Sequence, residues 1–179
     1  MNRKTKLFIN ILIILTFFVS IYFTEGYFLS KEEAINDALR CFYIEEKDVI
    51  DTLTFDKDII VLASDKNDKN LLMINFNLIG PFYKHTTKTF SQIYPELDLN
   101  ITYNFSQDNT IIFYAYRVNK DINHLEISFS NGDTIICNEW HHDYIYTTYK
   151  KPDVGILYCE IKAYDANNNY IGSFGGGSF

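Results

Sequence analysis

The sequence lacks the short motifs by which common classes of enzyme are recognised. It contains no HExxH pair of zinc ligands, no nucleophile elbow, no Cys–His spacing typical of a thiol nucleophile and no glycine loop that opens a helix and cradles phosphate. Its glycine-rich stretch, residues 175–177, precedes no helix. Because function is argued from a site and not from a fold, the sequence names no reaction, and we expect no cofactor.

Positive charge is scarce after the first few residues. Three of the 16 Lys and Arg precede residue 7, whereas all 23 Asp and Glu follow residue 23, so the chain beyond that point carries a net charge near −10. Nucleic acids and anionic membrane surfaces are bound through basic patches. The charge balance therefore argues against both, and we expect no nucleic-acid partner.

Cysteine is also scarce, and the count is odd. None of Cys41, Cys137 and Cys159 directly follows the opening hydrophobic run, which excludes the lipid-modified cysteine of a lipoprotein. An extracytoplasmic site permits disulfides. Cys137 and Cys159 both fall on expected strands and could form one; alternatively, all three are small buried hydrophobic residues.

The most prominent feature is a run from Leu7 to Phe23 whose only polar members are Asn10, Thr16 and Ser20. As a helix its 17 residues span about 26 Å, at the lower limit for crossing a bilayer. The basic residues precede the run, and positive charge stays on the cytoplasmic side. We therefore predict a cytoplasmic tail over 1–6, a single-pass transmembrane anchor over 7–23 and an extracytoplasmic body.

A cleaved signal peptide also has a basic start and an apolar middle. Cleavage needs small residues at the cut and two positions before it. Ser20 has the bulky Phe18 at that earlier position, and Gly26 with Thr24 is a mediocre match. An uncleaved anchor is the favoured interpretation, and secretion after cleavage is the alternative.

Residues 30–80 are predicted to form a small αβ subdomain. Ser30 and Glu33 make a capping box, and apolar residues at helical spacing follow as far as residue 42. Strands are expected over 49–55, 59–63 and 71–79, the last one half-buried, with alternating polar and apolar side chains. Residues 81–99 show no clear period and are predicted to be a connector.

Residues 100–174 are predicted to form an antiparallel β-sandwich-like subdomain. Its seven short strands are expected over 101–105, 110–118, 122–129, 134–137, 144–149, 156–164 and 170–174. The pair Asn131-Gly132 is a strong hairpin signal, because both residues tolerate positive φ. The glycine-rich residues 175–179 are predicted to be a flexible tail. The expected fold class is thus α+β, mainly β.

Two resemblances add to these expectations. Asn131-Gly132, Trp140 and the stretch from Ile161 to Asp165 resemble a set of small uncharacterised proteins, exported or membrane-anchored, from Gram-positive bacteria with a β-rich C-terminal region. Residues 30–79 are similar to the opening of PepSY-type domains. That second resemblance implies an inhibitor that restrains an extracellular protease.

One cluster carries metal-type ligands. If residues 139–143 are extended, Glu139, His141 and Asp143 share one face at the two-residue period of a strand. One imidazole and two carboxylates could hold a transition metal. The alternative is a polar loop or strand edge with Trp140 and Tyr144 in the core.

These observations leave two classes of function. The first, which we favour because catalytic motifs are lacking, is a membrane-anchored extracytoplasmic binding or accessory module that meets a protein or a cell-wall component. The second is a metal-dependent extracytoplasmic enzyme that uses Glu139, His141 and Asp143.

Overall fold

A computed structural model describes residues 3–24, 26–41, 43–44, 48–55, 58–65, 70–152 and 155–179. These residues form two helices, α1 (Arg3–Thr24) and α2 (Lys31–Cys41), and antiparallel strands. The strands are β1 (Tyr27–Phe28), β2 (Val49–Thr54), β3 (Asp58–Asp65), β4 (Asn70–Ile79), β5 (Phe82–Gln92), β6 (Leu99–Phe105), β7 (Thr110–Arg117), β8 (His124–Phe129), β9 (Thr134–Cys137), β10 (Tyr144–Lys150), β11 (Tyr158–Tyr164) and β12 (Tyr170–Ser178). The predicted class, α+β and mainly β, is confirmed.

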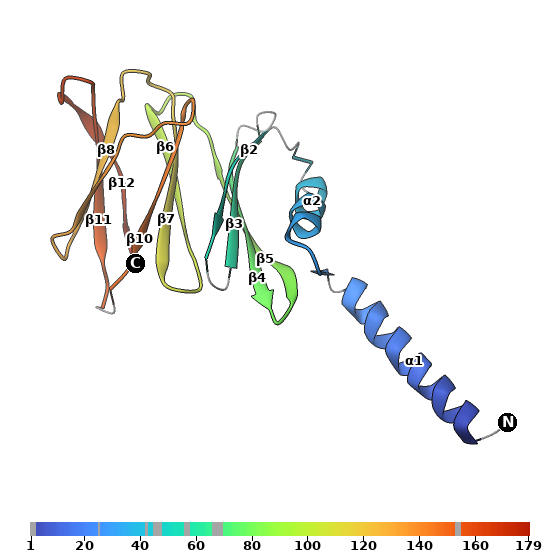
Figure 1. The fold of residues 1–179 in the computed structure, drawn as a ribbon. Helices are drawn as coiled ribbons and strands as arrows, with labels where there is room; N and C mark the ends of the chain where they lie inside the picture. Colours follow the sequence, from blue (N-terminus) through green and yellow to red (C-terminus); the bar gives the residue numbers. More distant parts are fainter. Residues whose placement is uncertain are drawn as a thin grey trace.

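The strands form three sheets that stack face to face (Figure 1). The first sheet has the order β1-β5-β4-β3-β2, the middle sheet β10-β7-β6 and the outer sheet β12-β11-β8-β9. Helix α2 covers the free face of the first sheet, so the body has four layers. Three separate clusters of buried side chains lie between them.

Helix α2 forms where the capping signal predicts it. The Ser30 Oγ accepts a hydrogen bond from the Glu33 N–H at 3.1 Å, which satisfies one of the unpaired amides of the first turn. Ala34, Ala38 and Leu39 are buried against the first sheet. The small alanines allow the helix to approach the sheet closely.

The first sheet is buried on both faces, which differs from the half-buried strand predicted for residues 71–79. Ile59 and Val61 face α2, whereas Ile60, Leu62 and Met73 face the middle sheet. The sequences of β3 and β4 are nearly continuous apolar runs, as expected for a strand covered on two sides. Only the last part of β4 is exposed.

The two predicted subdomains are joined into one body by the contact between the first and middle sheets. Besides its apolar cluster, this contact contains tyrosine hydroxyls that bond across the layers. The Tyr114 hydroxyl donates to the Ala63 carbonyl at 3.1 Å, and the Tyr144 hydroxyl donates to the Ser64 Oγ at 2.6 Å. Both bonds are buried, where an unpaired hydroxyl is costly.

The sandwich predicted for residues 100–174 is confirmed, with its core between the middle and outer sheets. Strands β6 to β12 lie at the seven predicted positions, and β9 matches its prediction at both ends. The core residues are Leu99, Ile111, Phe113, Ala115, Ile122, Leu125, Ile127, Phe129, Cys137, Ile145, Leu157, Ile161 and Ala163. Alternate residues of each strand supply them, as the period of two requires.

The predicted connector over 81–99 is wrong for most of its length. Residues 82–92 form β5, which pairs antiparallel with β4, so only residues 93–98 link the first sheet to the middle one. Sequence analysis did not recognise β5 as a strand because its composition is polar. Its exposed residues include threonine and lysine, so the sequence shows no alternation of apolar and polar side chains.

The predicted flexible tail over 175–179 is also wrong. Strand β12 continues to Ser178. The Phe179 N–H donates to the Leu157 carbonyl at 2.7 Å, and the Leu157 N–H donates to the Phe179 carbonyl at 2.9 Å. The glycines permit this docking: a Cβ on Gly176 would lie 2.8 Å from the Cys159 carbonyl oxygen. The Phe179 ring then packs at the open end of the sandwich.

The disulfide considered possible between Cys137 and Cys159 is not formed. Both are free thiols, as is Cys41. Cys137 lies on β9 and Cys159 on β11, with β8 between them. Two strand spacings amount to about 10 Å, beyond the reach of a disulfide.

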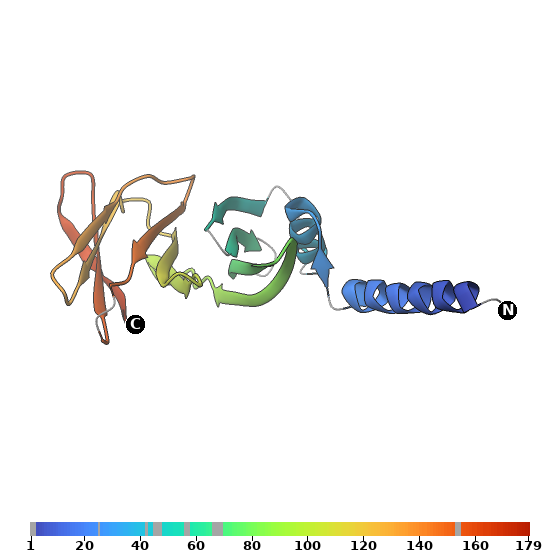
Figure 2. The ribbon, with the colours of Figure 1, turned by 60° about the horizontal axis from the view of Figure 1, so that its bottom comes forward.

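Helix α1 extends away from the body (Figure 2). Its described large hydrophobic side chains from Leu7 to Val19 are between 37% and 67% exposed, on every side of the helix. Over the part of the chain that the structure describes, neither helix is both long and apolar enough to cross a membrane.

Docking of the C-terminus predicts a stability loss on truncation of its last side chain. The Phe179 ring lies 4.8 Å from the Tyr103 ring and 5.9 Å from the Phe113 ring. Phe179→Ala should lower the free energy of unfolding by about 2 kcal/mol, less than for a fully buried Phe. The matched control Phe90→Ala, at a ring that is 66% exposed on β5, should change it by less than about 0.5 kcal/mol. Urea unfolding in mild detergent measures both, and equal effects would contradict docking.

The burial of the Asp58 carboxyl group leads us to expect a pH-dependent stability. Its side chain is buried at the contact between the first and middle sheets, where it accepts the Gln107 N–H at 2.7 Å. Burial raises the pKa of Asp58, against the lowering effect of that bond. A raised pKa in the folded state means that ionised Asp58 opposes folding once the pH exceeds the unfolded pKa of about 4.

Asp58→Asn keeps an acceptor for Gln107 and removes the charge. The variant should therefore gain stability over the wild type as the pH rises from about 4 to 7. Unfolding curves across this range check the sign, with Asp98→Asn at an exposed site as the control. A difference that does not change with pH would refute the role of the Asp58 charge.

Candidate functional site

Three loops meet at the end of the sandwich that lies away from α1 (Figure 1). They are residues 118–123 between β7 and β8, 138–143 between β9 and β10, and 165–169 between β11 and β12. An open cleft of about 550 Å³ lies between the first and third of these loops. The residues that line it are Arg117, Asn119, Lys120, Asp121, Ile122, Asn123, Asp165, Ala166, Asn167, Asn169, Tyr170 and Ile171.

Arg117 is the residue that ties these loops together. It ends β7, and its backbone N–H donates to the Asp143 carbonyl at 3.0 Å. Its guanidinium donates to the Ile122 carbonyl at 2.7 Å and to the His142 carbonyl at 3.2 Å. One planar side chain with five N–H donors thus fixes two neighbouring loops.

Trp140 packs against the same guanidinium. The Arg117 guanidinium carbon lies 4.4 Å from the centre of the Trp140 ring, within the range of a cation–π contact. The indole N–H donates to the Asn123 carbonyl at 2.6 Å. Trp140 therefore links its own loop, residues 138–143, to the loop of residues 118–123.

Asp143 provides the negative charge of this network. Its carboxylate pairs with Lys120 at 2.6 Å and with Arg117 at 3.5 Å. Burial raises the pKa of Asp143, but the two cations outweigh burial, so the pKa lies below its usual value. The group stays ionised at neutral pH and holds the lysine beside the cleft.

The residues of the predicted metal site are not brought together as that hypothesis requires. It assumed an extended segment, whereas His142 has φ 58° and residues 142–143 form a turn. Glu139 is exposed, the His141 ring stacks on Tyr146, and Asp143 pairs with cations. No group of three or more His, Cys, Asp or Glu among the described residues could hold a metal ion.

The loop between β11 and β12 forms the opposite wall of the cleft. The Asp165 carboxylate accepts the backbone N–H groups of Asn167 and Asn169 and the Asn169 side-chain amide, each at 2.8 Å. These bonds, led by those from Asn169, hold the pKa of Asp165 below its usual value. The carboxylate is thus used within the turn. Tyr170, which is 58% exposed, stands at the rim.

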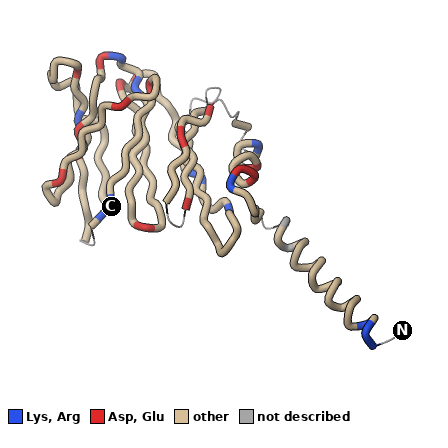
Figure 3. Tube along the Cα trace, viewed as in Figure 1, with Lys and Arg blue, Asp and Glu red and all other residues tan. Residues whose placement is uncertain are grey.

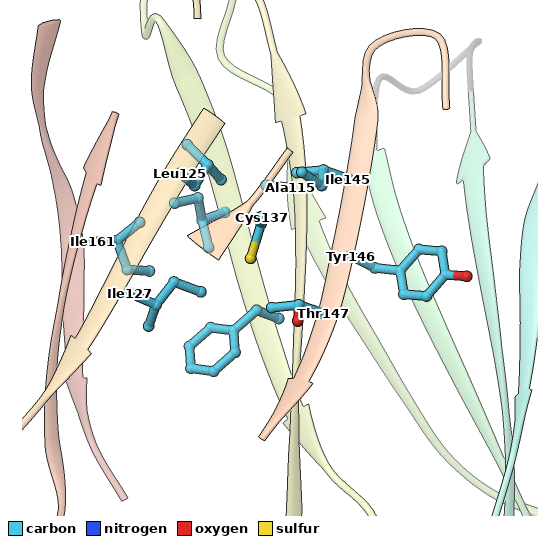
Figure 4. Close-up of a pocket in the computed structure, with 10 residues that line it drawn as sticks. Ala115, Leu125, Ile127, Cys137, Ile145, Tyr146, Thr147 and Ile161 are labelled. Carbon is cyan, nitrogen blue, oxygen red and sulfur yellow. The ribbon is translucent and has the colours of Figure 1, made fainter. Parts of the chain in front are cut away.

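A second cavity lies inside the sandwich and is not a ligand site. It is enclosed by apolar side chains around Cys137, among them Leu125, Ile127 and Ile161 (Figure 4). Its volume of about 10 Å³ is roughly the space of one water molecule. The Tyr146 ring points away from it, toward the first sheet. The cavity is a packing gap between two sheets.

The lining of the cleft is polar and carries no excess of either charge. Its charged residues balance, two of each sign, and four asparagines supply both donors and acceptors. No Ser, Thr, Cys or His is among the described residues that line it. The described lining therefore lacks the Ser–His or Cys–His pair of covalent catalysis.

Sequence analysis missed Arg117 as the centre of this site. The available signal was its rarity: among three arginines it is the only one after residue 40. Its partners Ile122 and His142 bond through backbone carbonyls, which leave no trace in side-chain patterns. Comparisons with known proteins give no further guidance, because no protein-family model and no curated protein matches the chain.

The network predicts that lysine cannot replace Arg117. Arg117→Lys keeps the charge but loses the planar fork, so stability should fall by about 1–3 kcal/mol. The emission of Trp140, the single tryptophan, should shift to longer wavelength as its ring becomes more exposed. Arg40→Lys is the matched control, since Arg40 pairs with Asp37 on the surface of α2. An unchanged Trp140 spectrum in Arg117→Lys would contradict this account.

Proposed function

We propose that this protein is a membrane-anchored extracytoplasmic binding or accessory protein. The run from Leu7 to Phe23 is its anchor, and the loop-end cleft is its binding surface, directed toward a protein or a cell-wall component. The observation that carries the proposal is α1: a helix apolar on all sides that projects from a body whose own cores are complete.

The energetics of α1 support a lipid environment. Burying one large aliphatic or aromatic side chain contributes about 1.5–3 kcal/mol. Side chains such as Phe8, Ile13 and Phe18, at 60% exposure or more, leave most of that contribution unrealised in water. A run of 17 residues covers about 26 Å, close to the hydrocarbon thickness after modest local thinning.

The charges at the N-terminus support the proposed orientation. Arg3, Lys4 and Lys6 precede the run, and such residues stay on the cytoplasmic side. The body then lies outside. Its loop end, with the cleft, points away from α1 and hence toward the extracellular space (Figure 1).

The rigidity of the cleft supports binding as its role. The Arg117, Trp140 and Asp143 contacts hold two of the three loops in one arrangement before any ligand arrives. A preorganised surface loses less entropy on binding. The balanced charges and the exposed Tyr170 suit an uncharged or weakly charged polar ligand.

Charge substitution in α1 tests the anchor. In Ile11→Lys combined with Ile14→Lys, two cations near the middle of the run should each oppose insertion by about 3 kcal/mol. The variant should therefore appear in the soluble fraction after an alkaline carbonate wash, whereas the wild type stays with the membranes. Ile136→Lys, at a side chain that is 64% exposed on β9, is the control and should remain bound. Release of the wild-type chain by the wash would refute the anchor.

A further inference from the structure

The turn between β4 and β5 is unusual in being apolar and exposed. Leu78 and Ile79 are 42% and 45% exposed, and Pro81 is exposed beside them. Ile79 pairs with Phe82, so the turn is tight, with Gly80 at φ 60°. Hairpin turns in water normally carry polar residues. No buried cluster of the body includes this tip, residues 78–82.

The tip is continuous with the last turn of α1. The Phe82 ring lies 4.7 Å from the Tyr22 ring and 6.3 Å from the Tyr27 ring. Tyr22 and Tyr27 stack on each other at 5.6 Å. These aromatic residues lie at the C-terminal end of the proposed anchor, where tyrosines are favoured at the boundary between lipid and water.

The β4–β5 hairpin carries lysines and no acidic residue, although Glu33 of α2 also acts on Tyr22 beside it. No Asp or Glu occurs between Asp68 and Glu96, although the body as a whole is strongly acidic. The same stretch contains Lys84 and Lys88 on β5, and blue marks lysine positions on this hairpin in Figure 3. The Lys84 ammonium lies 4.5 Å from the centre of the Tyr27 ring. Lysines near an anionic membrane surface each contribute about 1 kcal/mol of attraction.

We propose that the tip, residues 78–82, is a second membrane contact that rests in the interface of an anionic bilayer beside α1. Leu78 and Ile79 enter the boundary between headgroups and acyl chains, and Lys84 lies at headgroup level. This inference rests on the proposed anchor. The expectation from net charge concerns the body as a whole, whereas this inference concerns one stretch, residues 69–95, that lacks acidic residues.

Two points of contact with the membrane fix the orientation of the body, which a single helix does not. One helix crossing the membrane leaves the body free to rotate about the helix axis. A hairpin tip held at the same surface restricts that rotation. The cleft, at the opposite end of the body from the tip, is then kept directed away from the membrane (Figure 1).

Quenching by brominated lipid tests the contact on the full chain. The protein is reconstituted in vesicles that contain phosphatidylglycerol and phosphatidylcholine, with and without bromine on the upper acyl carbons. Three single variants each add one tryptophan: Ile79→Trp at the tip, Phe17→Trp in α1 and Ile136→Trp on β9. Ile136 is exposed like Ile79 but lies on the outer sheet, and the wild type supplies the Trp140 background.

The proposal expects loss of the added emission in brominated vesicles for Ile79→Trp and Phe17→Trp, and none for Ile136→Trp. Quenching of Phe17→Trp alone overturns the tip contact and leaves the anchor in place. Absence of quenching in all three overturns the anchor and the inference together. Quenching of Ile136→Trp as well shows adhesion of the whole body, which also overturns a specific contact at the tip.

A blue-shifted but unquenched Ile79→Trp would show that protein covers the tip instead of lipid. This result would likewise overturn the inference. A charge variant adds an independent check: Lys84→Glu combined with Lys88→Glu should reduce the quenching of Ile79→Trp, while quenching of Phe17→Trp is retained. Equal quenching at residue 79 with and without the lysines would contradict the role assigned to anionic lipid.

Discussion

The middle sheet is covered on both faces, and the arrangement of the body depends on this double burial. In β7, Ile111 and Phe113 face the outer sheet while Ile112 and Tyr114 face the first sheet. One strand therefore supplies two cores. Tyr114 fills an apolar site and still satisfies its hydroxyl on a carbonyl of β3, which an aliphatic residue could not do. Because β7 belongs to both clusters, a change in the packing of the sandwich also affects the packing of the first sheet.

A body built in this way separates its two ends. The loop end is fixed by the Arg117 contacts and presents a polar cleft with no Ser, Thr, Cys or His in its described lining. The other end presents α1 and the apolar tip between β4 and β5. The stacked sheets between them hold the two ends apart.

Much of the fold was predictable from local patterns, and the exceptions share a physical cause. Alternation located β8, the Asn131-Gly132 turn located β9, and the Ser30 cap located α2, because these signals depend on neighbouring residues. Strand β5 was missed because its pairing with β4, and not its own composition, makes it a strand. The glycines of residues 175–177 suggested flexibility, whereas their small size permits close approach to Cys159. Arg117 acts on backbone carbonyls, which side-chain patterns do not reveal. The extended segment assumed for Glu139, His141 and Asp143 is interrupted by one left-handed residue, His142.

The central claim is that the first sheet and the sandwich form one cooperative unit through the shared middle sheet. Amide hydrogen exchange across a urea series, read separately for β3 and for β8, tests it most directly. The claim predicts that both strands open with the same free energy and the same urea dependence, because neither core persists without β7. Exchange in β3 through a separate, less stable opening, with β8 still protected, would show two independent domains and contradict it.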